Sequence, residues 1–138
     1  MTFWPHPRIV LGQDAGSLNL LTPPDRRTEL IKSLGVDEVH VLEFNQEFSS
    51  MTAEQYIREV LQARFDVDAM VLGYDSRIGH DQLDPEQVRE LAERMGMDVI
   101  VTSPVCDSTL PISSTRIRKL LEQGDIPGAN ALLGYDYY

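Results

Sequence analysis

The sequence has one cysteine, few basic residues and no long apolar run. The single cysteine, Cys106, excludes an internal disulfide and is typical of a protein from a reducing cytosol. Twelve lysines and arginines against 22 aspartates and glutamates give a formal net charge of −10. This balance argues against nucleic acid or an anionic membrane as the main partner, but it leaves room for a phosphorylated small molecule.

Targeting segments and common catalytic motifs are missing too. No run is long enough to span a membrane, and the first ten residues hold two prolines and an arginine where a signal peptide needs apolar residues. The histidines, His6, His40 and His80, are too widely spaced to indicate a metal site. There is no G-x-S-x-G elbow, P-loop, dinucleotide fingerprint, internal repeat or linker. The length of 138 residues predicts a single domain over residues 1–138, and the lone cysteine with the lack of a signal peptide predicts that it is cytoplasmic.

Apolar stretches typical of strands alternate with stretches that have helix signals. We predict strands at 1–4, 37–44, 69–73 and 98–102, and helices over 22–35, 52–65, 84–96 and 113–134. Strict alternation implies βαβ crossovers, and therefore an α/β fold with a parallel sheet and helices on both faces. The run at 69–73, "AMVLG", is apolar throughout and is predicted to be covered on both faces.

Capping signals place the helix starts. Thr22 with Asp25, Thr52 with Gln55, and Asp84 with Gln87 each have the spacing of a capping box. In the first of these helices, Pro23 would occupy the first helical position and Gly35 would end the helix.

Ligands of open parallel sheets bind in the loops at the carboxyl ends of the strands. Three loops qualify: "PHPR" at 5–8, which we expect to be a stiff loop, "GYDSRIGHDQLD" at 73–84, and "SPVCDSTLPISS" at 103–114. Each has two interpretations. "FWPHP" forms a wall for a ring system or ends a strand and fills core. In the glycine loop, Asp75 binds ligand hydroxyls or makes a local turn.

The stretch "ISSTRIR", residues 112–118, places cations at the start of a helix, where partial positive charge makes them unfavourable. Such a conflict indicates a site for an anion, with hydroxyls, backbone N–H groups and an arginine holding phosphate oxygens. The alternative is ordinary N-capping beside two solvated arginines.

Taken together and in order, these stretches resemble a known family, the FAD synthetase (FMN adenylyltransferase) domain of bacterial bifunctional riboflavin kinase/FAD synthetases. "TFWPHPR" is similar to its T-F-x-P-H-P block, "EFSSMTAEQYIREVL" to its E-F segment, and "VLGYDSRIG" to V-G-x-D-F-R-F-G. "PISSTRIRKLLEQGD" is similar to its S-S-T-x-I-R block, and "LLGYDYY" to the close of the domain. The resemblance implies a Rossmann-like nucleotidylyltransferase fold and the reaction of ATP with FMN to give FAD and pyrophosphate.

The resemblance also implies residue roles. Ser113, Ser114, Thr115 and Arg118 match the motif that holds the ATP phosphates, with Ser114 and Arg118 in catalysis, whereas Arg116 occupies a variable position and is expected to be a surface residue. Mg²⁺ would accompany ATP, and no protein metal ligand is implied. The flavin and nucleotide pockets would be lined by Pro5, His6, Pro7, Arg8, Gly73, Asp75, Arg77 and Gly79.

The sequence departs from the family pattern in two ways. Ser76 and Ile78 replace aromatic residues of the glycine loop. The family's opening strand with its G-x-F-D-G-x-H-x-G-H loop, and the riboflavin kinase domain that normally follows, are not in this sequence. We therefore expect an N-terminally incomplete domain that makes FAD slowly or not at all by itself. A slot between the strands at 2–4 and 69–73 would favour self-association.

Two other functions remain open at the level of sequence. One is a sister nucleotidylyltransferase acting on another phosphorylated small molecule, such as pantetheine phosphate, nicotinamide mononucleotide or a cytidylyl substrate. The other is a non-catalytic nucleotide-binding or assembly module.

Overall fold

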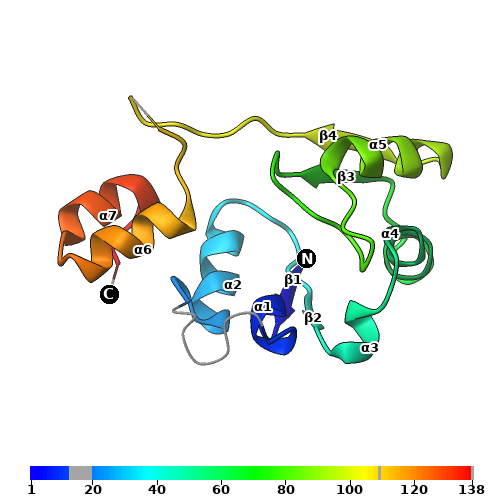
Figure 1. The fold of residues 1–138 in the computed structure, drawn as a ribbon, viewed down its shortest axis with the longest axis horizontal. Coiled ribbons are helices and arrows are strands. Elements are labelled where there is room, and N and C mark those ends of the chain that lie inside the picture. The colour runs from blue at the N-terminus through cyan, green and yellow to red at the C-terminus, as the bar shows by residue number, and fades with distance from the viewer. Residues whose placement is uncertain (13–19, 109, 138) are drawn as a thin grey trace.

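The structure is a computed structural model, and it describes residues 1–12, 20–108 and 110–137. Strands and helices alternate along the chain, as predicted (Figure 1). The elements are β1 (Thr2–Trp4), α1 (Pro7–Val10), α2 (Pro24–Ser33), β2 (Val41–Glu43), α3 (Gln46–Ser49), α4 (Ala53–Gln55), the π-helix η1 (Tyr56–Gln62), β3 (Ala69–Leu72), α5 (Pro85–Arg94), β4 (Asp98–Val101), α6 (Ser114–Glu122) and α7 (Ile126–Leu133).

All strand pairing between these elements is parallel, which confirms the α/β class. β1 pairs with β2, and Thr2 lies beside Val41. β3 pairs with β4, and Ala69 lies beside Asp98. Within the described residues the strands form two separate two-stranded sheets and not one continuous sheet.

The outer edges of β1 and β3 differ in how they are covered. Thr2 and Trp4 make the bonds to β2, so the intervening Phe3 directs its backbone groups to the other edge. There the Phe3 carbonyl accepts a hydrogen bond from the Arg27 guanidinium of α2 at 3.4 Å. By the same alternation Ala69 and Val71 of β3 direct their backbone groups away from β4, because Asp68 and Leu72 accept the bonds from that strand.

The face of the β3–β4 sheet that carries Val71 is open to solvent. Val71 lies beside Ile100 in the ladder, and these residues are 66% and 59% exposed. The prediction that the 69–73 strand is covered on both faces is therefore wrong. The apolar run is compatible with either arrangement, because periodicity does not show which elements lie on the second face.

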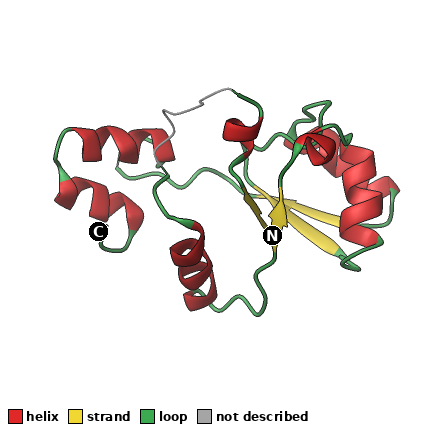
Figure 2. Cartoon of the chain, turned by 90° about the horizontal axis from the view of Figure 1, so that it is seen from below, coloured by secondary structure: helices red, strands yellow, loops and turns green. Residues whose placement is uncertain are grey.

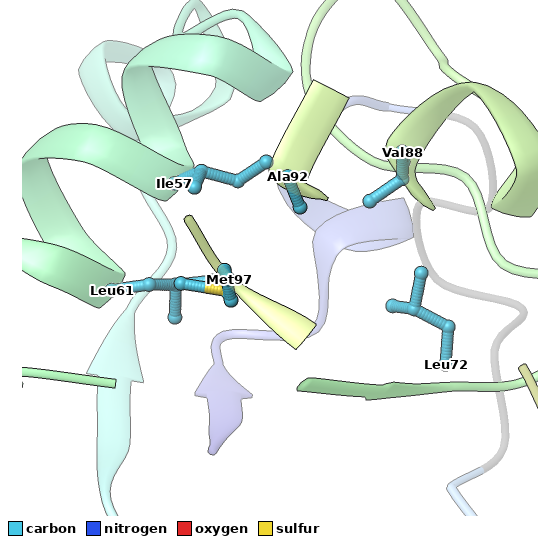
Figure 3. Close-up of a cluster of buried hydrophobic side chains, with 6 residues drawn as sticks. All are labelled: Ile57, Leu61, Leu72, Val88, Ala92 and Met97. Carbon is cyan, nitrogen blue, oxygen red and sulfur yellow. The ribbon is translucent and has the colours of Figure 1, made fainter. Parts of the chain in front are cut away.

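The main core lies on the opposite face of β3–β4, against η1 and α5 (Figure 3). Ile57, Val88 and Ala92 are fully buried there, and Met97 is 1% exposed. Burying a side chain of this size contributes about 1.5–3 kcal/mol relative to leaving it in water. The core cluster consists of Ile57, Leu61, Leu72, Val88, Ala92 and Met97.

Two of the three capping boxes are confirmed. Thr52 with Gln55 starts α4, and Asp84 with Gln87 starts α5. The box at Thr22 is wrong, because α2 begins at Pro24 with Pro23 as its N-cap and has no side-chain cap bond.

The helix that begins at Ala53 continues as a π-helix. The amide of Ala63 donates to the Arg58 carbonyl, five residues back, at 3.0 Å. The Gln62 side chain donates to the Met95 carbonyl at 2.8 Å, which ties this helix to the end of α5. π-helical segments are rare and are frequently found at functional sites.

α6 and α7 form a helical hairpin that lies on the opposite side of the molecule from α5 and η1 (Figures 1 and 2). Its interior holds Ile117 and Ala129, which are 5% and 0% exposed. The predicted stops are present, because Gly124 follows α6 with a φ of +78° and Gly134 ends α7 in a left-handed conformation.

Candidate functional site

A cavity of about 240 Å³ lies between three segments of the chain. β1 and α1 contribute one wall, the segment after β2 with α3 contributes the second, and the loop after β3 contributes the third. The lining residues are Phe3, Pro7, Leu11, Phe44, Phe48, Ser49, Met51, Tyr56, Arg77, Ile78, Gly79, His80 and Gln82.

Four aromatic rings from different elements form a cluster in the lining of this cavity. The ring of Phe48 lies 5.5 Å from those of Phe3 and Phe44 and 5.8 Å from that of Tyr56, measured between centroids. Phe3 and Phe44 meet edge to face at 6.0 Å. These separations are typical of favourable aromatic pairs, and the cluster presents a large apolar surface to a ligand.

Local structure places each ring. Phe3 sits in β1, and Phe44 follows the last residue of β2. The Asn45 side chain caps α3 by accepting a hydrogen bond from the Phe48 amide at 2.7 Å, which turns Phe48 back over the strand ends. Tyr56 is the first residue of the π-helix.

Tyr56 also supplies a polar atom to this aromatic cluster. Burial raises the pKa of the phenol above its ordinary value, because desolvation disfavours the phenolate. The hydroxyl is a hydrogen-bond donor, and in this structure it donates to the Met1 sulfur at 3.9 Å.

The glycine loop is held against the start of α4. The Ala53 amide donates to the Asp81 carboxylate at 2.9 Å, and the His80 amide donates to the Met51 carbonyl at 2.7 Å. Gly79 has a φ of +79°, and a Cβ there would lie 2.2 Å from the Ala53 nitrogen. Glycine is therefore required at this position both by conformation and by space.

Of the predicted flavin and nucleotide residues, Pro7, Arg77 and Gly79 line the cavity. The other five, Pro5, His6, Arg8, Gly73 and Asp75, are not part of its lining. The "PHPR" stretch is also not a plain loop, because Pro7–Val10 is helical and the His6 ring caps it by accepting from the Arg8 amide at 3.2 Å. Gly73 closes a backbone turn with Ser76 at 3.1 Å.

The substitutions in the glycine loop have different positions relative to the cavity. Ile78 is part of the lining, so an aliphatic side chain stands where the family pattern has an aromatic one. Ser76 is not in the lining. Trp4, the aromatic residue expected to form a wall, is 41% exposed, and its neighbour Phe3 lines the cavity in its place.

Sequence reasoning missed Phe3, Phe44, Phe48 and Tyr56 as a cluster. A signal was present for Phe44, because it follows a strand at the carboxyl end, where ligands of parallel sheets bind. Phe48 and Tyr56 gave no comparable signal, since their approach depends on how α3 and η1 pack.

The predicted phosphate motif lies at the start of α6, and its residues are not in the lining of the aromatic cavity. Ser113 is the N-cap, and its hydroxyl oxygen accepts a hydrogen bond from the Arg116 amide at 3.2 Å. Ser114 and Thr115 are exposed, and their amides belong to the first turn, which has no acceptors inside a helix. Arg118 is half-buried one turn along.

Arg116, expected from the sequence to be a surface residue, is partly exposed and is also engaged with its own chain. Its guanidinium forms an ion pair with the Asp107 carboxylate, and both side chains are 29% exposed. It also donates to the Leu110 carbonyl at 3.3 Å. The hydrogen bond and charge of Asp107 raise the pKa of Arg116 further above its ordinary value. The unfavourable cation at the helix start thus has an anion from its own chain.

Metal-ligating clusters and membrane-spanning helices are both absent from the described residues. Among the described residues, no group of three or more histidine, cysteine or acidic side chains is arranged to hold a metal ion. None of the helices within those residues has the length and apolar character needed to cross a membrane.

The family model for FAD synthetase matches residues 1–116, which include the strands, the aromatic cavity and the start of α6. The chain belongs to the FAD synthetase family. The Rossmann-like α/β fold expected from the resemblance agrees with this membership.

Similar curated proteins have names that refer to the same chemistry. The "Bifunctional riboflavin kinase/FMN adenylyltransferase" of Bacillus subtilis is 31% identical over 148 aligned residues, which cover 100% of this chain and 43% of that protein. The protein of the same name from Escherichia coli K12 is 27% identical and matches 99% of this chain and 44% of its own length. The FAD synthetase chain thus spans less than half the length of these relatives.

Among solved structures, one described as a macrolide-efflux protein from Streptococcus pneumoniae superposes with a TM-score of 0.82. It is 29% identical, and the match covers 99% of this chain and 51% of that one. The fold of the FAD synthetase chain therefore recurs in an experimental structure.

Proposed function

We propose that this FAD synthetase chain carries the part of an FMN adenylyltransferase that binds FMN and ATP and joins them as FAD, with release of pyrophosphate. The observation that carries this proposal is the cavity lined by Phe3, Phe44, Phe48 and Tyr56, in a chain whose relatives are named for FMN adenylyl transfer.

The cavity suits the ring system of a flavin. Its wall is aromatic and apolar, and a planar heterocycle gains from both burial and stacking there. Pro7 and Ile78 add apolar surface, while Arg77, His80 and Gln82 are polar residues of the lining. A volume of about 240 Å³ is below the range of cavities that enclose whole drug-sized ligands, and this favours a ring over an entire dinucleotide.

The chemistry requires no covalent intermediate. An oxygen of the FMN phosphate attacks the α-phosphorus of ATP in line, a new P–O bond forms, and the bond from the α-phosphorus to the bridging oxygen breaks. The leaving group is pyrophosphate. The protein contributes position and charge: the amides of Ser114 and Thr115 and the Arg118 guanidinium would hold the phosphates, with the helix dipole of α6 favouring their charge.

Mg²⁺ enters this proposal with the nucleotide. Mg²⁺ binds phosphate oxygens and keeps several waters, so few or no protein ligands are needed. The ion would reduce the charge of the phosphates during transfer.

The net charge of −10 favours small molecules over nucleic acid or membrane as partners, and the proposed compartment is the cytoplasm.

Self-association is proposed to run through β3. In β1 the outward carbonyl of Phe3 is covered by Arg27, whereas in β3 the side chain of Val71 is 66% exposed.

Titration of FMN fluorescence tests the flavin half of the proposal. Phe48→Leu removes the ring that contacts the three others, and we expect FMN binding to weaken by about tenfold. Phe65→Leu is the matched control, because Phe65 packs on His40 and is not in the cavity lining. Equal affinity of the two variants for FMN, or no binding by the unmodified protein, would remove the flavin assignment.

A further inference from the structure

The segment before α6 forms a small hairpin, here called the 105–112 hairpin, whose Thr109 lies outside the described residues. Cys106 pairs with Pro111 in an antiparallel bridge. The Ile112 amide donates to the Val105 carbonyl at 2.8 Å, and the Asp107 amide donates to the Leu110 carbonyl at 3.1 Å. The Asp107 carboxylate also accepts from the Leu110 amide at 3.0 Å.

Arg116 links this hairpin to the first turn of α6. One guanidinium nitrogen pairs with the Asp107 carboxylate, and the other donates to the Leu110 carbonyl at 3.3 Å. Its backbone amide is bound by the Ser113 hydroxyl, the cap of the helix. A single residue thus joins the cap, the helix and both ends of the described hairpin turn.

Two large apolar side chains of the described part of the hairpin are exposed. Val105 is 72% exposed and Leu110 is 56% exposed, so apolar burial contributes little to its position. Arginine suits such a link, because the nitrogens of its planar guanidinium are spread apart and can bond a carboxylate and a second acceptor in fixed directions, whereas lysine has a single nitrogen.

We propose that Arg116 is a positioning residue: with Asp107 it fixes the 105–112 hairpin beside Ser114 and Thr115, and the hairpin forms one side of the site that receives the ATP phosphates. This inference rests on the proposed function for the role of that site. The link between Arg116 and the hairpin is observed directly and does not depend on the proposed function.

The consequence is a division of roles between the two arginines of "STRIR". Arg116 is already engaged with an anion of its own chain, and it acts through the hairpin. Arg118 is the arginine proposed to contact phosphate. Losing Arg116 should therefore affect the affinity for nucleotide more than the rate of the chemical step.

The test combines amide hydrogen exchange with steady-state kinetics, using the full-length protein. Arg116→Ala, Asp107→Asn and the double variant are compared, with Arg89→Ala as control. Arg89, whose side chain is 35% exposed against 29% for Arg116, forms an ion pair with Glu86 on α5, across the molecule. We expect the amides of Leu110 and Ile112 to exchange faster in all three hairpin variants and at the normal rate in the control.

The kinetic result should show a split between KM and kcat. We expect KM for ATP to rise about fivefold in each single variant, with kcat and KM for FMN within about twofold of normal. The double variant should be no worse than either single change, because both remove the same link. Arg116→Lys, which retains one charged contact, should restore part of the affinity.

Three results would overturn the inference in distinguishable ways. Unchanged exchange at Leu110 and Ile112 would show that Arg116 does not fix the hairpin. Faster exchange with an unchanged KM for ATP would show that the hairpin is not part of the nucleotide site, and the proposed function would stand. If the unmodified protein binds no Mg-ATP, the positioning role and the proposed function both fail, whatever the exchange result.

Discussion

Gly79 lies so close to Ala53 that an added Cβ would come within 2.2 Å of the Ala53 backbone nitrogen. This contact joins the glycine loop to the first turn of α4 and fixes one wall of the aromatic cavity. Its position next to the proposed flavin site gives it two measurable consequences, one for stability and one for binding.

Gly79→Ala should destabilise the protein and weaken FMN binding. The backbone must keep a φ of +79°, and the new methyl group meets backbone atoms that cannot rotate away. We expect a loss of about 1–3 kcal/mol in the free energy of unfolding, measured by urea denaturation. Gly73→Ala is the control, because a Cβ there meets only side-chain atoms at 3.4 and 3.5 Å. Equal losses at the two positions would contradict the packing argument.

The phenol of Tyr56 should make stability depend on pH in the alkaline range. Burial raises its pKa in the folded protein above the unfolded value of 10.0, so the folded state holds the proton more tightly. The contribution is fully present below pH 10 and is lost as the pH rises through the folded pKa.

Tyr56→Phe should therefore reduce the fall in the free energy of unfolding between pH 9 and pH 11, measured by denaturation at each pH. Tyr74→Phe is the control, since that side chain is 44% exposed. An alkaline fall that is unchanged in Tyr56→Phe would show that the buried phenol is not its source.

The starts of α4 and α5 could be predicted from sequence because a capping box closes within three residues. The start of α2 could not be placed correctly, for an equally local reason. Pro24 disfavours the helical conformation at the residue before it, so Pro23 stays extended with a ψ of 160° and the helix begins one residue late. Thr22 then lies too far from the first turn to cap it.

The candidate site was predictable only where it depends on chain order. The loops after β1 and β3 follow strand ends, and Pro7, Arg77 and Gly79 meet in one cavity as their positions suggested. The aromatic cluster depends on packing between α3 and η1, and the pairing of Arg116 with Asp107 spans nine residues across a hairpin. Neither contact leaves a periodic pattern in the sequence.

Arg118→Ala should reduce adenylyl transfer strongly while leaving the fold intact. A charge that stabilises the transferring phosphates contributes most in the transition state, and we expect kcat to fall about a hundredfold. The measurement is FAD formation by the full-length protein, with circular dichroism to check folding. Arg89→Ala is the control for the loss of a cation. Comparable effects of the two changes would remove the role assigned to Arg118.

The open edge of β3 should determine whether the isolated chain associates with itself. Val71→Lys places a charge beside the outward backbone groups of Ala69 and Val71 and should shift sedimentation toward the monomer. Val41→Lys, on the exposed face of β2, is the matched control, since that residue is 48% exposed but not on the β3 edge. A monomeric chain at high concentration, with strong amide protection across Ala69–Leu72, would rule out association through this edge.

The most direct test of the central proposal is to measure the products that the full-length protein forms from FMN and Mg-ATP, resolved by chromatography. We expect FAD and pyrophosphate in equal amounts, and we expect FAD formation to fall in Phe48→Leu but not in Phe65→Leu. Adenylylation of pantetheine phosphate or nicotinamide mononucleotide in place of FMN would indicate a sister enzyme. Binding of both substrates without any FAD would indicate a non-catalytic module, and either result would contradict the assignment of this chain to FAD synthesis.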